Sequence, residues 1–102
     1  MATSYQRGRT AEYRSKKWLE NEGYLVVRSA GSHGPIDLVA IPADTTEEGY
    51  FATRCVQVIQ VKAGYCNVGA ELDRLAALPI AHVSRCLHVW KKGAHAPEVY
   101  HP

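Results

Sequence analysis

The sequence predicts a single α/β domain over residues 1–102, with a mixed central sheet flanked by helices. Runs of β-forming residues alternate with segments of helical periodicity, in the order helix, three strands, helix, two strands. A chain of 102 residues has room for one hydrophobic core and no second domain. Its hydrophobic fraction of 46% and charged fraction of 22% are those of an ordinary globular protein.

The first helix is predicted over Gln6–Asn21, where good helix formers dominate. One stripe at helical spacing consists of Ala11, Ser15, Trp18 and Leu19. Gly23 follows where a left-handed residue would end the helix. The β-forming run Tyr24–Arg28 predicts the first strand, and Ser29–Pro35, rich in turn formers, predicts a loop.

Two further strands are predicted in the middle of the chain. Ile36–Ile41 is nearly apolar on both faces and reads as a buried second strand. Pro42–Gly49 is polar and predicts a hairpin tip. Tyr50–Ala63 is expected to contain a longer third strand with its centre in CVQVIQVKA.

The last part of the chain predicts one helix and two closing strands. Val68–Leu78 has helical periodicity, and Pro79 is expected to stop the helix. Arg85–Trp90 and Pro97–Tyr100 read as strands around the turn Lys91–Ala96. The expected apolar face of the helix consists of Val68, Leu72, Leu75 and Ala76.

Charge and cysteine content narrow the class of protein. The net charge of +2 is small, but basic residues gather before Arg28 and the segment Asp37–Glu48 carries acids only. This segregation fits either a phosphate-facing side or a solvated helix face. Three cysteines without CxxC spacing argue against a disulfide framework or zinc site, and we expect them to pack as small hydrophobes. Without an apolar leader or membrane span, an intracellular, cytoplasmic and reducing location is expected.

A chemical signal comes from polar residues inside apolar strands. Asp37 lies in IDLVAI, and a buried carboxylate there needs compensation. Gln60 and Lys62 share one face near the end of the third strand. If these two strands are antiparallel neighbours, the three side chains converge. Carboxylate and amide oxygens suit a magnesium ion, and an ammonium group can stabilise negative charge on a phosphate.

A structural reading of the same residues stays open. Asp37 and Lys62 could form a buried ion pair, with Gln57 and Gln60 facing solvent on a half-exposed strand. Glu12 lies at the margin of the buried helix stripe and could add a carboxylate to the metal. It could equally form an ordinary helix pair with Lys16.

The segments GRTAEY, GYLVVRSAGSHGPIDLVAI and VIQVKAG resemble the archaeal and phage-type Holliday junction resolvases of the PD-(D/E)XK nuclease superfamily. The resemblance is dense over residues 7–63 and looser afterwards. It implies a restriction-endonuclease-like fold. It also implies that Asp37 is the central metal ligand, Gln60 the second ligand, Lys62 the catalytic lysine and Glu12 the acid near the metal. The backbone carbonyl of Val61 would be a further ligand by analogy.

The resemblance also implies DNA contacts. Arg28 matches the arginine at the strand exit, and Ser32 lies in the matching loop. His33 in the same loop is either a DNA contact or an exposed loop histidine. Sequence-independent phosphate contacts are expected from Arg7, Arg9, Lys16 and Lys17.

The sequence departs from the family pattern in two places. Gln60 stands where an acid is usual, and a neutral amide binds magnesium more weakly. Tyr13 stands where a basic residue often follows the helix acid.

The expected function is a Mg²⁺-dependent endodeoxyribonuclease, with Mn²⁺ able to substitute, that resolves four-way junctions by paired symmetric nicks. Two nicks suggest a homodimer, for which Val68–Ile80 and the closing strands could supply apolar surface. A less selective nuclease of the same fold and a catalytically silent junction-binding module are the alternatives.

Overall fold

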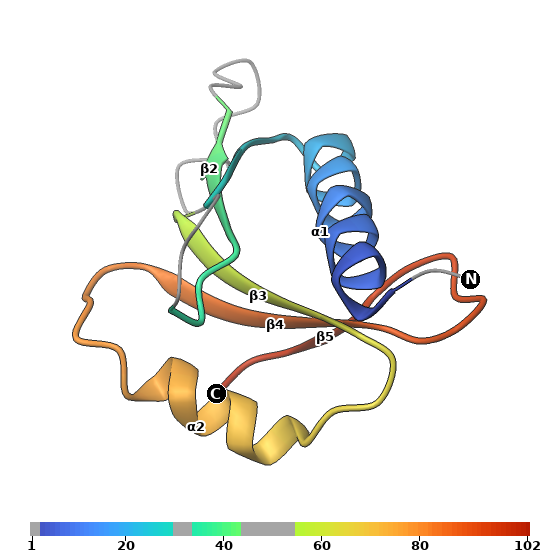
Figure 1. The fold of residues 1–102 in the computed structure, drawn as a ribbon. Helices are drawn as coiled ribbons and strands as arrows, with labels where there is room; N and C mark the ends of the chain where they lie inside the picture. Colours follow the sequence, from blue (N-terminus) through green and yellow to red (C-terminus); the bar gives the residue numbers. More distant parts are fainter. Residues whose placement is uncertain (1–2, 30–33, 44–54) are drawn as a thin grey trace.

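A five-stranded mixed sheet with a helix on each face forms the domain in this computed structural model (Figure 1). The structure describes residues 3–29, 34–43 and 55–102. Its elements are α1 (Ser4–Asn21), β1 (Tyr24–Arg28), β2 (Leu38–Pro42), β3 (Gln57–Ala63), α2 (Val68–Ala76), β4 (Ser84–Trp90) and β5 (Glu98–Tyr100). The predicted order of helices and strands is confirmed.

The strands follow one another across the sheet in chain order, β1-β2-β3-β4-β5. β1, β2 and β3 pair antiparallel, with Leu38 opposite Ile59. α2 then carries the chain over one face of the sheet, so that β4 pairs parallel to β3, with Lys62 opposite Val89. β5 returns antiparallel to β4. β3 therefore lies at the centre of the sheet.

α1 covers one face of the sheet with the stripe that the sequence predicted. The helix begins with a capping box, in which the Thr3 hydroxyl accepts from the Gln6 N–H and the Gln6 side chain accepts from the Thr3 N–H. It ends before Gly23, whose φ of 94° is the predicted left-handed conformation. The core beneath it contains Ala11, Leu19, Val26, Leu38, Ala40, Ile59, Val61, Cys86 and Trp90.

α2 covers the opposite face with three of the four residues expected on its apolar side. Val68, Leu72 and Leu75 pack against Leu87 and Val89 of β4. Ala76, predicted on the apolar face, is exposed, whereas Glu71 is buried. The apolar side of this helix thus packs inside the domain, and the use of Val68–Ile80 to pair two subunits stays a prediction. No helix in residues 3–29 or 55–102 is long and apolar enough to cross a membrane.

The middle strands differ from the prediction at their edges. β2 begins at Leu38, so Asp37 lies just before the strand rather than within it. Ile41 is 38% exposed, so β2 is not buried on both faces. β3 begins at Gln57. The predicted hairpin tip falls largely on residues 44–49, outside the described residues.

The three cysteines differ from one another in burial. Cys86 is buried in the core under α1, and Cys66 packs partly against the α2 core. Cys55 is exposed. The prediction of cysteines as small hydrophobes is confirmed for the first two and wrong for Cys55.

A polar network lies inside the α1 core. The Trp90 Nε1–H donates to the Ser15 hydroxyl at 2.6 Å, and the Ser15 oxygen lies 3.0 Å from His88 Nδ1. An indole N–H can only donate, so the serine oxygen accepts that bond and its own proton is free for His88. The ring is neutral because burial lowers the pKa of His88 to about 4, and a neutral ring can accept the Ser15 proton at Nδ1.

We expect Ser15→Ala to lower the free energy of unfolding by about 1–3 kcal/mol, because it leaves the buried Trp90 N–H without an acceptor. Chemical denaturation measures the change. Trp90→Phe removes that donor, so the double variant should lose less stability than the sum of the two single variants. A fully additive double variant would contradict the network.

Candidate active site

Asp37 is held in place by the backbone of two neighbouring segments, Ser29 after β1 and strand β3. Its N–H donates to the Ile59 carbonyl at 2.9 Å, and its carbonyl accepts from Ser29 at 2.8 Å. Its carboxylate oxygen Oδ2 accepts from the Val61 N–H at 2.8 Å. The side chain therefore takes the place of a backbone acceptor where β2 has not yet begun. This fixes the carboxylate beside β3.

The charge of Asp37 is under opposing influences. Burial raises the pKa of its carboxyl, and the bond from Val61 lowers it. The negative charge of Glu12 also raises this pKa, while Lys62 and Arg28 lower it. The structure thus brings Glu12, Arg28 and Lys62 within electrostatic reach of Asp37.

Gln60 and Lys62 lie on the α2 side of β3. The register sets them opposite Leu87 and Val89, which pack under α2. Gln60 is only 4% exposed, and its oxygen Oε1 is buried without a hydrogen-bond partner among the described residues. The alternative of a solvent-facing Gln60 is wrong. Gln57 is not free either, since it donates to the Tyr24 hydroxyl at 2.7 Å.

Glu12 is engaged by an arginine rather than by the lysine one turn away. Arg28 Nε lies 3.0 Å from Glu12 Oε1, and Lys16 pairs instead with Glu20 at 2.8 Å. The alternative Glu12–Lys16 pair is therefore wrong. Arg28 also stands over the Tyr13 ring, 5.2 Å from its centroid. Arg28 was predicted to contact DNA; in the structure it holds a candidate metal ligand.

Glu71 is a site residue that the sequence analysis missed. Its carboxylate oxygen Oε1 lies 4.0 Å from Lys62 Nζ and 3.6 Å from Arg74. Its other oxygen is buried and has no hydrogen-bond partner in the described part of the chain. The sequence could have indicated this residue, because Glu71 is a carboxylate within the apolar helix stripe formed by Val68, Leu72 and Leu75. A buried acid at an apolar position needs a compensating cation, and Arg74 and Lys62 both lie beside Glu71.

The ion pair expected as an alternative, between Asp37 and Lys62, is not what forms. Lys62 pairs with Glu71, and Asp37 is satisfied by the backbone. Both groups nevertheless belong to one electrostatic cluster, since Lys62 lowers the pKa of Asp37. Lys62 thus stands between two carboxylates.

The oxygen donors around Asp37 fit a divalent cation. No three His, Cys, Asp or Glu side chains of the described residues gather closely enough to hold a metal by themselves. The amide oxygen of Gln60 is buried and has no hydrogen-bond partner among the described residues. It would serve as a further oxygen ligand beside the Asp37 carboxylate. The Val61 carbonyl points to the same side of β3 as the Val61 N–H that meets Asp37. An acid, an amide oxygen and a carbonyl form the kind of set that magnesium accepts alongside water.

The predicted phosphate contacts are scattered. Arg7 lines a cleft at the start of α1. Arg9 stands over the Tyr13 ring at 5.8 Å, Lys16 is paired with Glu20, and Lys17 is exposed. Ser32 and His33 lie outside the described residues. Arg9 and Arg28 both lie beside the Tyr13 ring, whereas Arg7 lies apart from them in the cleft.

Comparison with models of known protein families gives no match. A comparison with curated protein sequences gives no significant match either. The functional assignment therefore rests on the chemistry of Asp37, Gln60, Lys62 and Glu12.

Gln60→Glu tests the amide position. We expect Mg²⁺-dependent cleavage to be retained or raised, because a carboxylate binds magnesium more strongly than an amide. Without metal, the added charge is buried beside other acids, so the melting temperature in chelator should fall and recover on adding Mg²⁺. Gln57→Glu, on the other face of β3, should show no such recovery. Loss of the magnesium response in Gln60→Glu would contradict the ligand assignment.

Proposed function

We propose that this chain is a divalent-metal-dependent endodeoxyribonuclease of restriction-endonuclease-like fold that resolves four-way DNA junctions. The observation that carries the proposal is the buried, unpartnered oxygen of Gln60 on β3, in the residue before Val61, whose N–H holds the Asp37 carboxylate. An unsatisfied buried acceptor is unfavourable, and a bound cation would satisfy the Gln60 oxygen.

Each residue has a defined task in phosphodiester hydrolysis. Asp37, Gln60 and the Val61 carbonyl would hold Mg²⁺, which supplies Lewis-acid polarisation and an acidified water when bound. Lys62 places a positive charge beside that set and stabilises negative charge that develops on the phosphate. Glu71 holds the lysine from the α2 side.

Glu12 and Arg28 form the second part of the site. In their ion pair the Arg28 side chain is 24% and the Glu12 side chain 21% exposed. Glu12 is close enough to raise the pKa of Asp37, so the two carboxylates favour a cation between them. Arg28 balances Glu12 and can turn toward a phosphate when a substrate arrives.

The four-way junction is proposed as substrate because the resemblance to junction resolvases covers the segments that form this site. A junction is close to two-fold symmetric, and two matched nicks require two sites. A homodimer with one site in each subunit supplies them.

One assay tests this function. Labelled four-way junction and linear duplex of the same sequence are incubated with Mg²⁺, Mn²⁺ or chelator. We expect paired symmetric nicks in the junction with either metal and none in chelator. Equal cutting of the duplex would favour a less selective nuclease. Binding of the junction without cutting under either metal would favour a silent binding module, an outcome to which the neutral Gln60 and the engaged Glu12 lend weight.

A further inference from the structure

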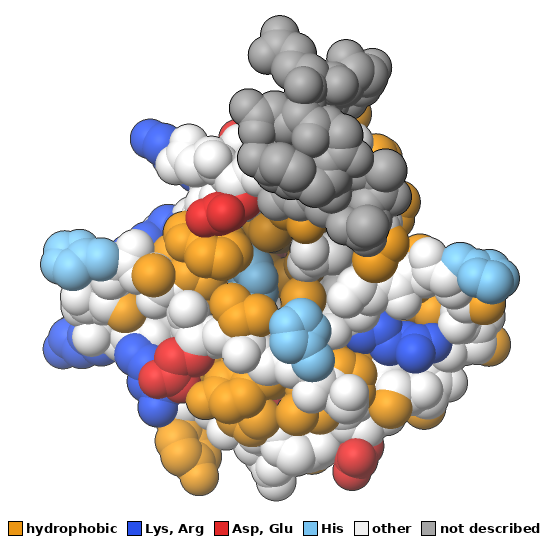
Figure 2. Space-filling model, turned by 180° about the vertical axis from the view of Figure 1, so that it is seen from behind, with side chains coloured by type: hydrophobic (Ala, Val, Ile, Leu, Met, Phe, Trp, Pro, Cys, Tyr) orange, Lys and Arg blue, Asp and Glu red, His pale blue; other side chains and the backbone are white. Residues whose placement is uncertain are grey.

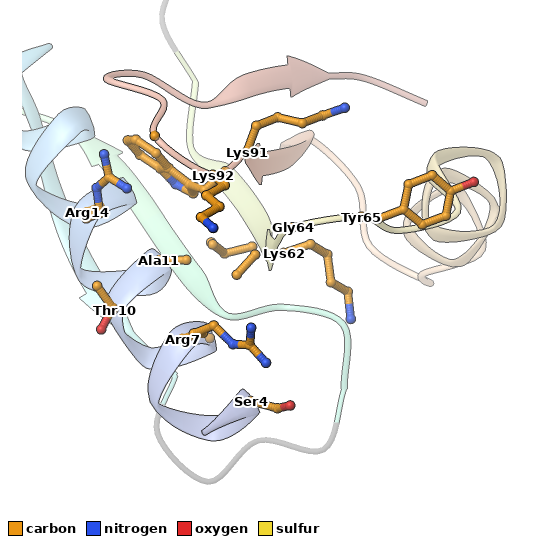
Figure 3. A pocket seen from close by; sticks show the side chains of 15 residues that line it. Ser4, Arg7, Thr10, Ala11, Arg14, Lys62, Gly64, Tyr65, Lys91 and Lys92 are labelled. Atoms are coloured by element: carbon orange, nitrogen blue, oxygen red, sulfur yellow. The ribbon is translucent and has the colours of Figure 1, made fainter. Parts of the chain in front are cut away.

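A cleft of about 770 Å³ opens between the start of α1 and the ends of β3 and β4. Figure 3 shows its wall on α1, with Arg7 and Arg14, and its opposite wall on the segments that follow the two strands. Val61 and Lys62 are among its lining residues, whereas Glu12, Asp37 and Gln60 are not. The cleft therefore adjoins the candidate active site without being part of it.

The charges in this cleft have one sign. Its lining contains Arg7, Arg14, Lys62, Lys91 and Lys92, and no Asp or Glu belongs to it. Arg7 and Lys92 form no ion pair within residues 3–29, 34–43 and 55–102, and Lys62 and Lys91 reach their carboxylates only at 4.0 Å. A concave surface of one sign focuses its field on an anion of the opposite sign.

One of these cations is fixed rather than mobile. Arg14 donates to the Ala94 carbonyl and lies over the Trp90 ring, 4.2 Å from its centroid. Trp90 is itself held by Ser15. The guanidinium therefore joins α1 to the loop after β4 and keeps the two walls together. Such a preorganised wall suits a site more than a chance gathering of surface lysines.

An aromatic ring projects at the end of the cleft away from Arg14 (Figure 3). Tyr65 is 95% exposed and follows Gly64, whose φ of 79° favours glycine and turns the chain out of β3. A ring so exposed has both faces free for stacking. Aromatic rings beside a basic groove are the combination that binds unpaired nucleotides.

We propose that this cleft binds one unpaired DNA strand, with its phosphates along the cationic walls and a base stacked on Tyr65. A cleft of about 770 Å³ is of the size of ligand pockets, about 300–1,000 Å³, and encloses a single backbone rather than a duplex. The face seen in Figure 2 lacks such a charge of one sign, since hydrophobic side chains lie in its middle with acidic and basic groups mixed around them.

The inference rests on the proposed function only in assuming that the bound strand continues past Lys62, where its phosphate would be cleaved. Its test therefore measures binding alone. Fluorescence anisotropy of a labelled oligothymidylate is followed in chelator at several salt concentrations, so that no cleavage takes place and failure of catalysis does not affect the result.

Two pairs of variants test the cleft. Tyr65→Ala should weaken binding about 5-fold or more, whereas Tyr5→Ala, equally an exposed tyrosine but outside the cleft, should not. Lys92→Gln should lower the salt slope by about 0.7, the value for one phosphate of a single strand. Arg74→Gln removes the same charge from the exposed side of α2 and should leave the slope unchanged.

The proposal is overturned if Tyr65→Ala and Lys92→Gln bind the oligothymidylate as the wild type does. Equal losses for oligothymidylate and for linear duplex would also overturn it, because the cleft would then contact phosphates without selecting an unpaired strand. Tighter binding of an oligouridylate than of the oligothymidylate would assign the cleft to RNA instead. If these variants behave as expected while the junction assay shows no cutting, the cleft stands and the nuclease function falls.

Discussion

Asp37→Asn is expected to lower metal-dependent cleavage of a four-way junction by about 1000-fold or more. The substitution removes the negative charge at the centre of the site but keeps an amide oxygen that can still accept the Val61 N–H. Loss of one preorganised group that acts on the transition state lowers kcat by about 100- to 1000-fold, and loss of a central metal ligand should reach at least that range. Nick formation under single-turnover conditions measures the effect.

The same variant should remain folded and bind the junction in chelator. Asp73→Asn is the matched control, because Asp73 is exposed on α2 and loses the same charge; it should cut at the wild-type rate. An Asp37→Asn protein that cuts as fast as the wild type would place the chemistry elsewhere. If this variant does not fold, Lys62→Met tests the same site, and undiminished cutting by it would be equally contrary to the proposal.

Acid is expected to destabilise the protein through His88. Burial, and then the charge of His101, lowers the pKa of His88 from its ordinary 6.5 to about 4. Between these values the unfolded chain carries a proton on this residue that the folded chain does not, so stability falls as pH falls. The contribution to the free energy of unfolding should decrease by about 3 kcal/mol from about pH 7 to about pH 4.

Urea unfolding at several pH values, with the wild type and His88→Gln compared, isolates this contribution from those of other groups. The decrease should be absent in His88→Gln and retained in His95→Gln, which removes an exposed histidine. The ring signals of His88 in the native protein should also not titrate above about pH 5. A decrease of equal size in wild type and His88→Gln would show that the Ser15–His88 contact does not depend on a neutral ring.

Local pattern was enough to predict most of the fold. The stripe of α1, the left-handed Gly23 and the β-forming run of β1 depend on neighbours a few residues away, and so their signals are contained in short windows. The convergence of Asp37 with Lys62 also followed from pattern, because β2 and β3 are antiparallel neighbours. The start of β2 was placed too early because the Asp37 side chain, and not its backbone, meets Val61.

The sequence by itself determined the order of the elements and which of its polar residues are unusual for apolar strands. Only the tertiary structure decided the partners of those residues: Arg28 rather than Lys16 for Glu12, and Glu71 rather than Asp37 for Lys62. It also decided the basic cleft, which Arg14 closes by contacting Ala94 across 80 positions of the chain. Such contacts join segments that no local window contains, because the packing of both helices on the sheet brings them together.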